Sequence, residues 1–122
     1  MQIDERTIGE VVVLDLHGRM TVSESDRLIR DTVQGLVTRG ARKLVLNFAD
    51  VPYMDSVGVS TLVRLRLLLS QDDGRLKLLK LPRRIADLLA ITGLTAAFEV
   101  FDEESDAIRS FDRPDGQVSG QG

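Results

Sequence analysis

The chain has 122 residues, of which 43% are hydrophobic and 29% charged, and its net charge at pH 7 is −3. This length suits one domain, the composition is typical of a folded protein, and the overall charge gives no support to general nucleic-acid or membrane-surface binding. The absence of cysteine and the single histidine, His17, exclude disulfides, thiolate nucleophiles and cysteine-based metal sites. We therefore expect a protein that binds other molecules rather than an enzyme, with no cofactor and no metal.

The sequence shows neither a membrane span nor a signal peptide. No run approaches the roughly 18 to 20 apolar residues that a span requires. Residues 1–6 lack the basic start and apolar stretch of a signal peptide. We expect a cytoplasmic protein.

Two strands are predicted at the N-terminus, over residues 3–7 and 11–16, with a tight turn at Gly9 between them. In the second strand, apolar residues alternate with a face that carries Asp15 and His17. The two strands are expected to form a hairpin, with Val12, Leu14 and Leu16 on one face of the second strand.

A helix is predicted over residues 24–38, with Ser23 as its N-cap, Asp26 completing an imperfect capping box and Gly40 as its stop. Its apolar stripe at helical spacing comprises Leu28, Ile29, Val33, Leu36 and Val37. The following segment, 43–48, is apolar on both faces, which is typical of a central strand.

The second half of the chain alternates helices with strands. We expect a largely buried helix at 59–70, a strand at 75–79, a helix at 82–91, a strand at 98–101 and a helix at 105–111. Pro82 suits the first helical position, and Gly93 suits a helix end. The apolar stripe of the 82–91 helix comprises Ile85, Leu88, Leu89 and either Ile91 or Thr92.

The resulting order, β-β-α-β-α-β-α-β-α, predicts a single α/β domain. Its sheet is expected to be mixed and mostly parallel, with four or five strands, about four helices and one hairpin at the N-terminal edge. We place the domain at residues 1–112 and a flexible tail at 113–122, because the tail has almost nothing apolar to bury.

Basic residues gather between positions 64 and 84, and acidic residues between 99 and 115. The basic set comprises Arg64, Arg66, Arg75, Lys77, Lys80, Arg83 and Arg84. Solvated helix faces are the commoner cause of such runs, and an interaction surface is the alternative. The sequence does not show whether these charges converge in space.

The most distinctive local motif is Asp-Ser-Val-Gly at residues 55–58, at the head of a buried helix. In a structural interpretation, Asp55 or Ser56 caps the helix and Gly58 allows close packing of its first turn. In a functional interpretation, the same helix start stabilises an anion, so Ser56 can carry a phosphate without unravelling the helix. Such a phosphate would change what docks on that surface.

Other chemistry has little support. There is no glycine-rich phosphate loop and no Gly-x-Ser-x-Gly motif around Ser56. His17 is better interpreted as a surface histidine than as a base for Ser56. The acidic run at 102–104 lacks the spaced ligands of a calcium loop and suits the first turn of the last helix.

The stretch from Lys43 to Leu62, KLVLNFADVPYMDSVGVSTL, resembles the signature of bacterial anti-sigma-factor antagonists in the STAS-domain family. The likeness extends over residues 3–112, because the order of elements, the Gly18 loop and the Pro82 helix also agree. It implies that Ser56 is phosphorylated by an anti-sigma factor that is itself a serine kinase. In the family, the unphosphorylated antagonist binds that anti-sigma factor and releases the sigma factor, and a phosphatase resets the switch.

The resemblance also indicates where a protein partner would bind. The residues expected to contact it are Arg19, Met20, Thr21, Met54, Asp55, Ser56, Val57 and Gly58. We expect no direct contact with nucleic acid or a membrane, and either a monomer or a homodimer.

One loop departs from the family pattern. There the loop after the second strand reads Gly-x-Leu-Asp, and its carboxylate lies near the phosphorylated serine. Here it reads Gly-Arg-Met-Thr over residues 18–21, so Thr21 becomes a second candidate acceptor and Arg19 adds a positive charge. The departure supports an alternative function, a non-switched STAS scaffold subunit of a stress-signalling assembly.

Overall fold

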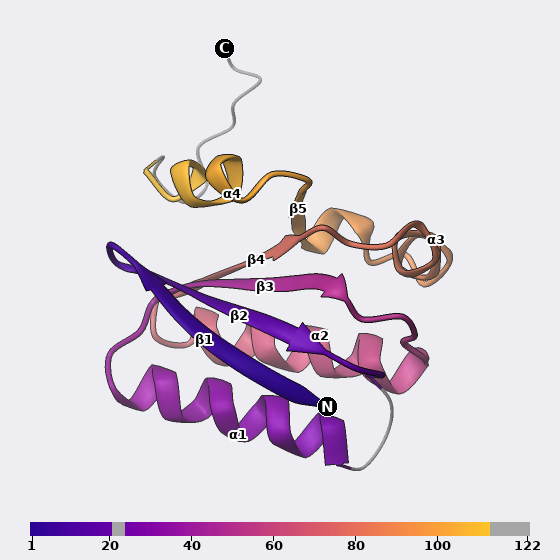
Figure 1. Cartoon of the computed structure of the whole chain (residues 1–122), viewed down its shortest axis with the longest axis horizontal. Helices are drawn as coiled ribbons and strands as arrows, with labels where there is room; N and C mark the ends of the chain where they lie inside the picture. The colour runs from indigo at the N-terminus through magenta and orange to yellow at the C-terminus, as the bar shows by residue number, and fades with distance from the viewer. Residues whose placement is uncertain (21–23, 113–122) are drawn as a thin grey trace.

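Five strands form one mixed sheet in the order β1-β2-β3-β4-β5 (Figure 1). The computed structural model describes residues 1–20 and 24–112. β1 and β2 are antiparallel, and every other neighbouring pair is parallel. The strands are β1 (Gln2–Ile8), β2 (Val11–His17), β3 (Lys43–Asp50), β4 (Arg75–Leu79) and β5 (Glu99–Phe101).

Four α-helices cover the sheet: α1 (Glu24–Thr38), α2 (Ser56–Ser70), α3 (Arg83–Ile91) and α4 (Glu104–Ser110). α1 and α2 lie on one face and α4 on the other, while α3 lies beside the end of the sheet where the chain passes from β3 into α2 (Figure 1). The predicted α/β class, mixed sheet and N-terminal hairpin are confirmed.

The larger core lies between the sheet and helices α1 and α2. Every second residue of β2 points into it, as the alternation predicts, and β3 contributes in the same way. Its strand residues are Val12, Leu14, Leu16, Leu44, Leu46, Phe48, Leu76 and Leu78. Helices α1 and α2 add Ile29, Val33, Leu36, Val37, Val59, Leu62, Leu65 and Leu69.

A smaller core lies between the sheet and α4. It comprises Val11, Val13, Val45, Leu79, Ala107 and Phe111. Because β2 and β3 contribute to both cores, their sequences are apolar on both faces. The side chain of Lys77 is also buried on this side, with its Nζ atom 4.5 Å from the centre of the Phe111 ring.

The end of α3 shows why a glycine follows it. Gly93 has φ of +75°, which a residue with a side chain rarely adopts. Its N–H donates to the carbonyl of Ala90, and that of Leu94 to the carbonyl of Leu89. These bonds satisfy carbonyls at the helix end, so the predicted stop at Gly93 is confirmed.

Several details differ from the sequence predictions. α2 begins at Ser56, three residues before the predicted start, because the motif at 55–58 belongs to its first turn. Pro82 is the N-cap of α3 and not its first residue. An unpredicted 3-10 turn, Thr95–Ala97, precedes β5, which begins at Glu99.

The buried stripes of α1 and α3 are narrower than predicted, because Leu28 and both candidates for the end of the α3 stripe, Ile91 and Thr92, are exposed. Leu28 of α1 is 39% exposed, and Ile91 of α3 is 82% exposed. Both occupy the margin of an apolar stripe that is narrower than the sequence suggests. The proposed Ser23 cap and the tail at 113–122 lie outside the described residues.

Candidate functional site

The loops after β2 and β3 run side by side at the carboxyl edge of the parallel strands. The N–H of Gly18 donates to the carbonyl of Asp50 at 3.0 Å, and that of Met20 donates to the carbonyl of Tyr53 at 2.8 Å. Met20 and Met54 then form an isolated parallel bridge. These bonds hold the loop that begins at Gly18 directly against the approach to α2.

Asp55 caps α2 with its side chain. Its Oδ1 atom accepts from the N–H groups of Val57 at 3.0 Å and Gly58 at 3.1 Å. Its extended backbone, with φ of −104° and ψ of −173°, is typical of an N-cap. Of the two capping candidates, Asp55 therefore caps α2, and two otherwise unpaired donors are satisfied.

Ser56 is the first helical residue of α2. The position of its side chain lies outside the described part of the structure, as does the whole of Thr21. The backbone thus places Ser56 at the start of a helix, as the motif predicts, while the phosphorylation of Ser56 or Thr21 stays a prediction.

Gly58 is required by the close approach of the two loops. A Cβ atom at this position would lie 2.6 Å from Cγ of Met54 and 2.9 Å from the carbonyl oxygen of Met20. Both distances are shorter than any normal contact, so only glycine fits without a shift of the neighbouring backbone. The predicted packing role of Gly58 is confirmed.

The residues expected to meet a partner separate into two groups. Met20 and Met54 are at most 3% exposed, so these side chains support the surface from below and are not part of it. Arg19 is exposed and lies over the ring of Tyr53, with 5.1 Å from its Cζ atom to the ring centre. Asp55 and Val57 are half-buried. Whether any of them binds a partner remains a prediction.

A polar cluster between α1 and α2 was not predicted from the sequence. The hydroxyl of Thr61 donates to Asp26 and lies 3.0 Å from the carbonyl oxygen of Val57. Nε of Arg30 donates to the same carboxylate at 3.1 Å, and Arg64 lies 3.5 Å from it. The Thr61 hydrogen bond, aided by Arg30, holds the pKa of Asp26 below its usual value. This cluster fixes the first turns of α2 against α1.

His17 connects the ends of three strands. Its Nδ1 atom lies 2.9 Å from a carboxylate oxygen of Asp50, and its Nε2 atom lies 3.0 Å from one of Asp4. Both ring nitrogens are therefore engaged by carboxylates, which agrees with a surface role and not with that of a base for Ser56.

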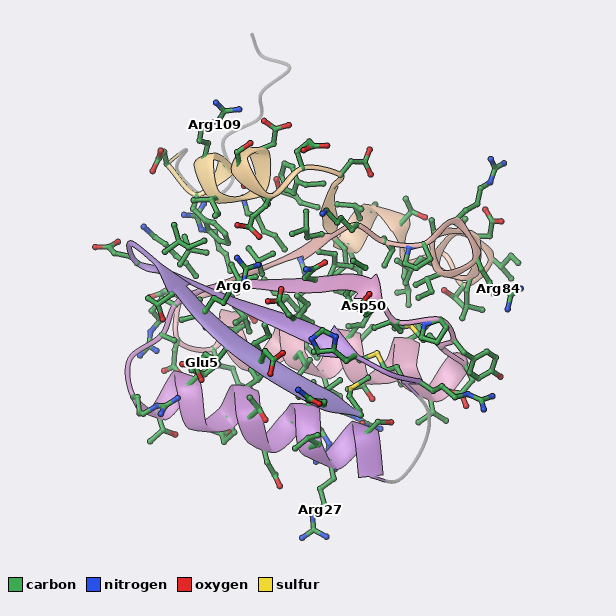
Figure 2. All side chains as sticks on the ribbon, in the orientation of Figure 1. Glu5, Arg6, Arg27, Asp50, Arg84 and Arg109 are labelled. Carbon is green, nitrogen blue, oxygen red and sulfur yellow. The ribbon has the colours of Figure 1, made fainter. Side chains whose placement is uncertain are left out.

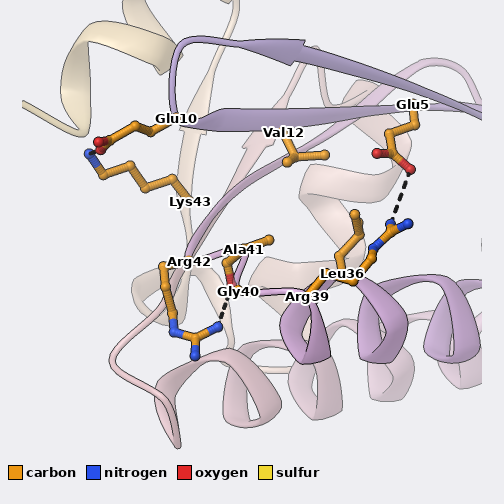
Figure 3. Close-up of a pocket in the computed structure, with 9 residues that line it drawn as sticks. All are labelled: Glu5, Glu10, Val12, Leu36, Arg39, Gly40, Ala41, Arg42 and Lys43. Atoms are coloured by element: carbon orange, nitrogen blue, oxygen red, sulfur yellow. Dashed lines mark hydrogen bonds and ion pairs between the residues drawn. The ribbon is translucent and has the colours of Figure 1, made fainter.

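A hollow of about 540 Å³ lies at the other end of the sheet, around the end of α1 (Figure 3). Val12, Leu36 and Ala41 form its apolar part. Its charged groups neutralise one another through the pairs Arg39 with Glu5 and Lys43 with Glu10. The third cation of the lining, Arg42, donates from Nη1 to the backbone carbonyls of Val37 and Ala41, so all three cations of the hollow are already bonded within the protein.

Residues 1–20 and 24–112 contain neither a metal-binding cluster nor a membrane-spanning helix. No cluster of three histidine or acidic side chains is arranged to hold a metal ion. No helix in these ranges is long and apolar enough to cross a membrane.

The order of strands, the two adjoining loops and the capped start of α2 together define a known kind of domain. Residues 2–107 match the STAS domain family, and the chain belongs to that family. No curated protein matches the chain significantly.

Solved structures share the fold at low sequence identity. TM1081 from Thermotoga maritima is 21% identical, with a TM-score of 0.84 over 91% of this chain and 95% of its own. SpoIIAA, a cell fate determinant of Bacillus, has been solved in its phosphorylated form, which is 23% identical, with a TM-score of 0.72 over 90% of this chain and 99% of its own. The unphosphorylated form of SpoIIAA, described as an anti-sigma factor antagonist, is also similar. The murine anion transporter Slc26a9 is 15% identical, with a TM-score of 0.73 over 88% of this chain and 18% of its own. At these identities the likeness establishes the fold alone.

Proposed function

We propose that the chain is an anti-sigma-factor antagonist that phosphorylation of Ser56 switches off. Its unphosphorylated form binds an anti-sigma factor with serine kinase activity, and the sigma factor is released. Phosphorylation by the same kinase ends the interaction, and a serine phosphatase restores it. In this role the protein is cytoplasmic, is not an enzyme and needs no cofactor, because the partner supplies the catalysis.

The observation that carries this proposal is the construction of the α2 start. Ser56 is the first residue of a helix whose cap is supplied by Asp55 and not by Ser56 itself. Chemistry on the hydroxyl of Ser56 therefore leaves the capping hydrogen bonds intact. Added negative charge is also favourable at a helix N-terminus, where the dipole is positive.

The switch follows from charge at a docking surface. A phosphate adds about −1.5 to −2 charge and a tightly held hydration shell. A partner that fits the uncharged surface must then desolvate this group or face repulsion from it. Binding is lost without refolding, because the first turn of α2 is closely packed at Gly58 against Met20 and Met54 and is already fixed.

A non-switched scaffold subunit is the second candidate function. It rests on the loop sequence Gly-Arg-Met-Thr at 18–21, which replaces the usual carboxylate with Thr21. A large stable assembly in solution that does not depend on phosphate would favour it over the switch.

Phosphorylation can be tested with the kinase-type anti-sigma factor encoded nearest to this gene. Incubation with that kinase and ATP, followed by mass spectrometry of peptides, should show one phosphate on Ser56. Ser56→Ala should remove the signal, and Thr21→Ala should retain it. A phosphate on Thr21 alone, or none on either residue, would contradict the proposal.

A further inference from the structure

The basic run between residues 64 and 84 separates into two groups in the structure. Three of its side chains are used inside the fold, where they bond to other residues of the protein: Arg64, Arg75 and Lys77. The others form no ion pair or side-chain hydrogen bond within residues 1–20 and 24–112: Arg66, Lys80, Arg83 and Arg84.

Three of these unpaired cations lie close together in sequence, between the end of β4 and the first turn of α3. Lys80, Arg83 and Arg84 are all exposed, and Figure 2 shows Arg84 extending away from the protein on the outer side of α3. Lys80 follows β4, just as Arg19 follows β2. Because β2, β3 and β4 are parallel neighbours, these cations share the carboxyl edge from which α2 begins.

The positions of Arg83 and Arg84 are unfavourable for the helix that carries them. α3 has no acidic residue in its first turn, and Pro82 provides no side-chain cap. Two cations at this end oppose the helix dipole. By contrast, α4 carries Glu104 in its first turn and Arg109 in its last, in agreement with the dipole. The helix dipole therefore does not explain the two arginines of α3, and neither forms an ion pair with Asp87, the acidic residue one turn further along this helix.

The same side of α3 carries apolar surface. Leu88 and Ile91 follow Arg84 by four and seven residues, so the three side chains lie along one side of the helix. Ile91 is 82% exposed and Leu88 is half-buried. A surface with basic groups next to apolar side chains is complementary to a partner segment that presents carboxylates next to an apolar residue.

We infer that this surface docks an acidic, amphipathic segment of the anti-sigma factor. We call it the α3 surface, and it comprises Arg19, Lys80, Arg83, Arg84, Leu88 and Ile91. That the partner is the anti-sigma factor rests on the proposed function. That the docked segment is acidic rests on charge complementarity, because the chain has a net charge of −3 and yet gathers unpaired cations at this edge. Such charges accelerate encounter and fix the orientation of a partner.

The test compares two charge reversals of equal size. The Kd of the full-length kinase-type anti-sigma factor encoded nearest to this gene is measured by isothermal titration calorimetry. The test variant is Arg83→Glu/Arg84→Glu. The control is Arg39→Glu/Arg109→Glu, which makes the same change in net charge on exposed side chains of the α1 end and α4. Circular dichroism confirms that both variants are folded.

The inference predicts that the α3 variant binds about tenfold or more weakly, and that added NaCl reduces the difference. The control should stay within about twofold of the unaltered protein. Arg83→Lys/Arg84→Lys should retain most of the affinity, because the charge is kept. Ile91→Ala should weaken binding without changing its dependence on salt.

Including Ser56→Asp separates this inference from the proposed function. If Ser56→Asp abolishes binding while the α3 variant binds normally, the α3 surface is refuted and the switch stands. If the α3 variant loses binding while Ser56→Asp binds normally, the switch is refuted and the α3 surface stands. If the unaltered protein does not bind this anti-sigma factor, both are refuted.

Discussion

The helices are held on the two faces of the sheet by different kinds of contact. Among the described residues, 22 buried apolar side chains, including Ile85 and Leu89 of α3, form the core on the side of α1 and α2, whereas six form the core beneath α4. The smaller core is completed by polar contacts: Lys77 lies 2.8 Å from the hydroxyl of Ser110, and Arg6 bridges Asp15 and Glu104. The first face is therefore held by burial, and the second depends more on specific pairs.

This difference bears on where a switch can be placed. The candidate site belongs to the strongly packed side, because one side of α2 is buried from Val59 to Leu69 and Gly58 is closely packed against Met20 and Met54. A rigid support allows an added charge to alter the surface without altering the fold beneath it. Four predictions test this contrast.

The largest effect is expected from Leu62→Ala in α2. Leu62 is fully buried in the larger core, so the change should lower the free energy of unfolding by about 2 to 5 kcal/mol. Leu67→Ala is the control on the same helix, since Leu67 is 52% exposed, and it should cost less than about 0.5 kcal/mol. Urea denaturation measures both, and equal losses would contradict the assignment of the two helix faces.

The second largest loss of stability is expected where the loops after β2 and β3 pack against the start of α2. Gly58→Ala places a methyl group against the Met20 carbonyl and should cost about 1 to 3 kcal/mol. Gly35→Ala is the matched control in α1, where nothing lies within 4 Å of the new methyl group. It should stabilise the protein by about 0.5 to 1 kcal/mol. Changes of the same sign in both variants would refute the close packing at Gly58.

The Asp26–Thr61 contact should make stability depend on pH. The pKa of Asp26 is lower in the folded protein than in the unfolded chain, where it is near 3.8. The carboxylate therefore adds to the free energy of unfolding at pH values above the unfolded pKa, and this stabilisation is lost as the pH falls through the folded pKa. Asp26→Asn should cost about 1 kcal/mol at pH 7. This difference should shrink as the pH falls below about 4.

Thermal unfolding between pH 2.5 and pH 7 measures that difference. Asp31→Asn serves as its control, because Asp31 is exposed and its partner Arg27 lies 3.9 Å away. A difference between the unaltered protein and Asp26→Asn that stays constant over this range would show that the Asp26 carboxylate does not act as described.

The smallest effect is expected on the α4 face. Lys77→Met keeps the length of the buried side chain and removes its charge, so stability should change by less than about 1 kcal/mol. Ser110 still donates to the carbonyl of Ala107 in that variant. Lys77→Ala should cost more, because it also removes the buried stem. A loss for Lys77→Met as large as that for Leu62→Ala would reverse the contrast between the two faces.

The order of elements was predictable because it depends on local patterns. The stop at Gly93 and the cap near Asp55 follow from residues that lie next to one another in sequence. The Asp26–Thr61 contact was not predictable, because it joins residues 35 positions apart through the packing of α1 on α2. The burial of Lys77 was not predicted, because lysine is seldom buried and its partners Ser110, Phe111 and Glu99 are distant in sequence.

The apolar stripes show a second limit of local patterns. The spacing of Leu28 and Ile91 matches the buried side of each helix, yet both are exposed. Spacing gives the direction of a side chain, but the width of the buried stripe depends on what covers it. For Ile91, nothing in the described part of the chain covers the side chain, which is why the α3 surface could be inferred only from the structure.

The central claim is that a charge on Ser56 changes the carboxyl edge and leaves the fold as it is. The most direct test compares the ¹⁵N–¹H correlation spectra of the unphosphorylated protein and the protein phosphorylated on Ser56. We predict shifts confined to the loop that begins at Gly18, the start of α2 and the facing side of α3, with the amides of β4 and α4 unchanged. Shifts across β4 and α4, or a loss of spectral dispersion, would contradict the account.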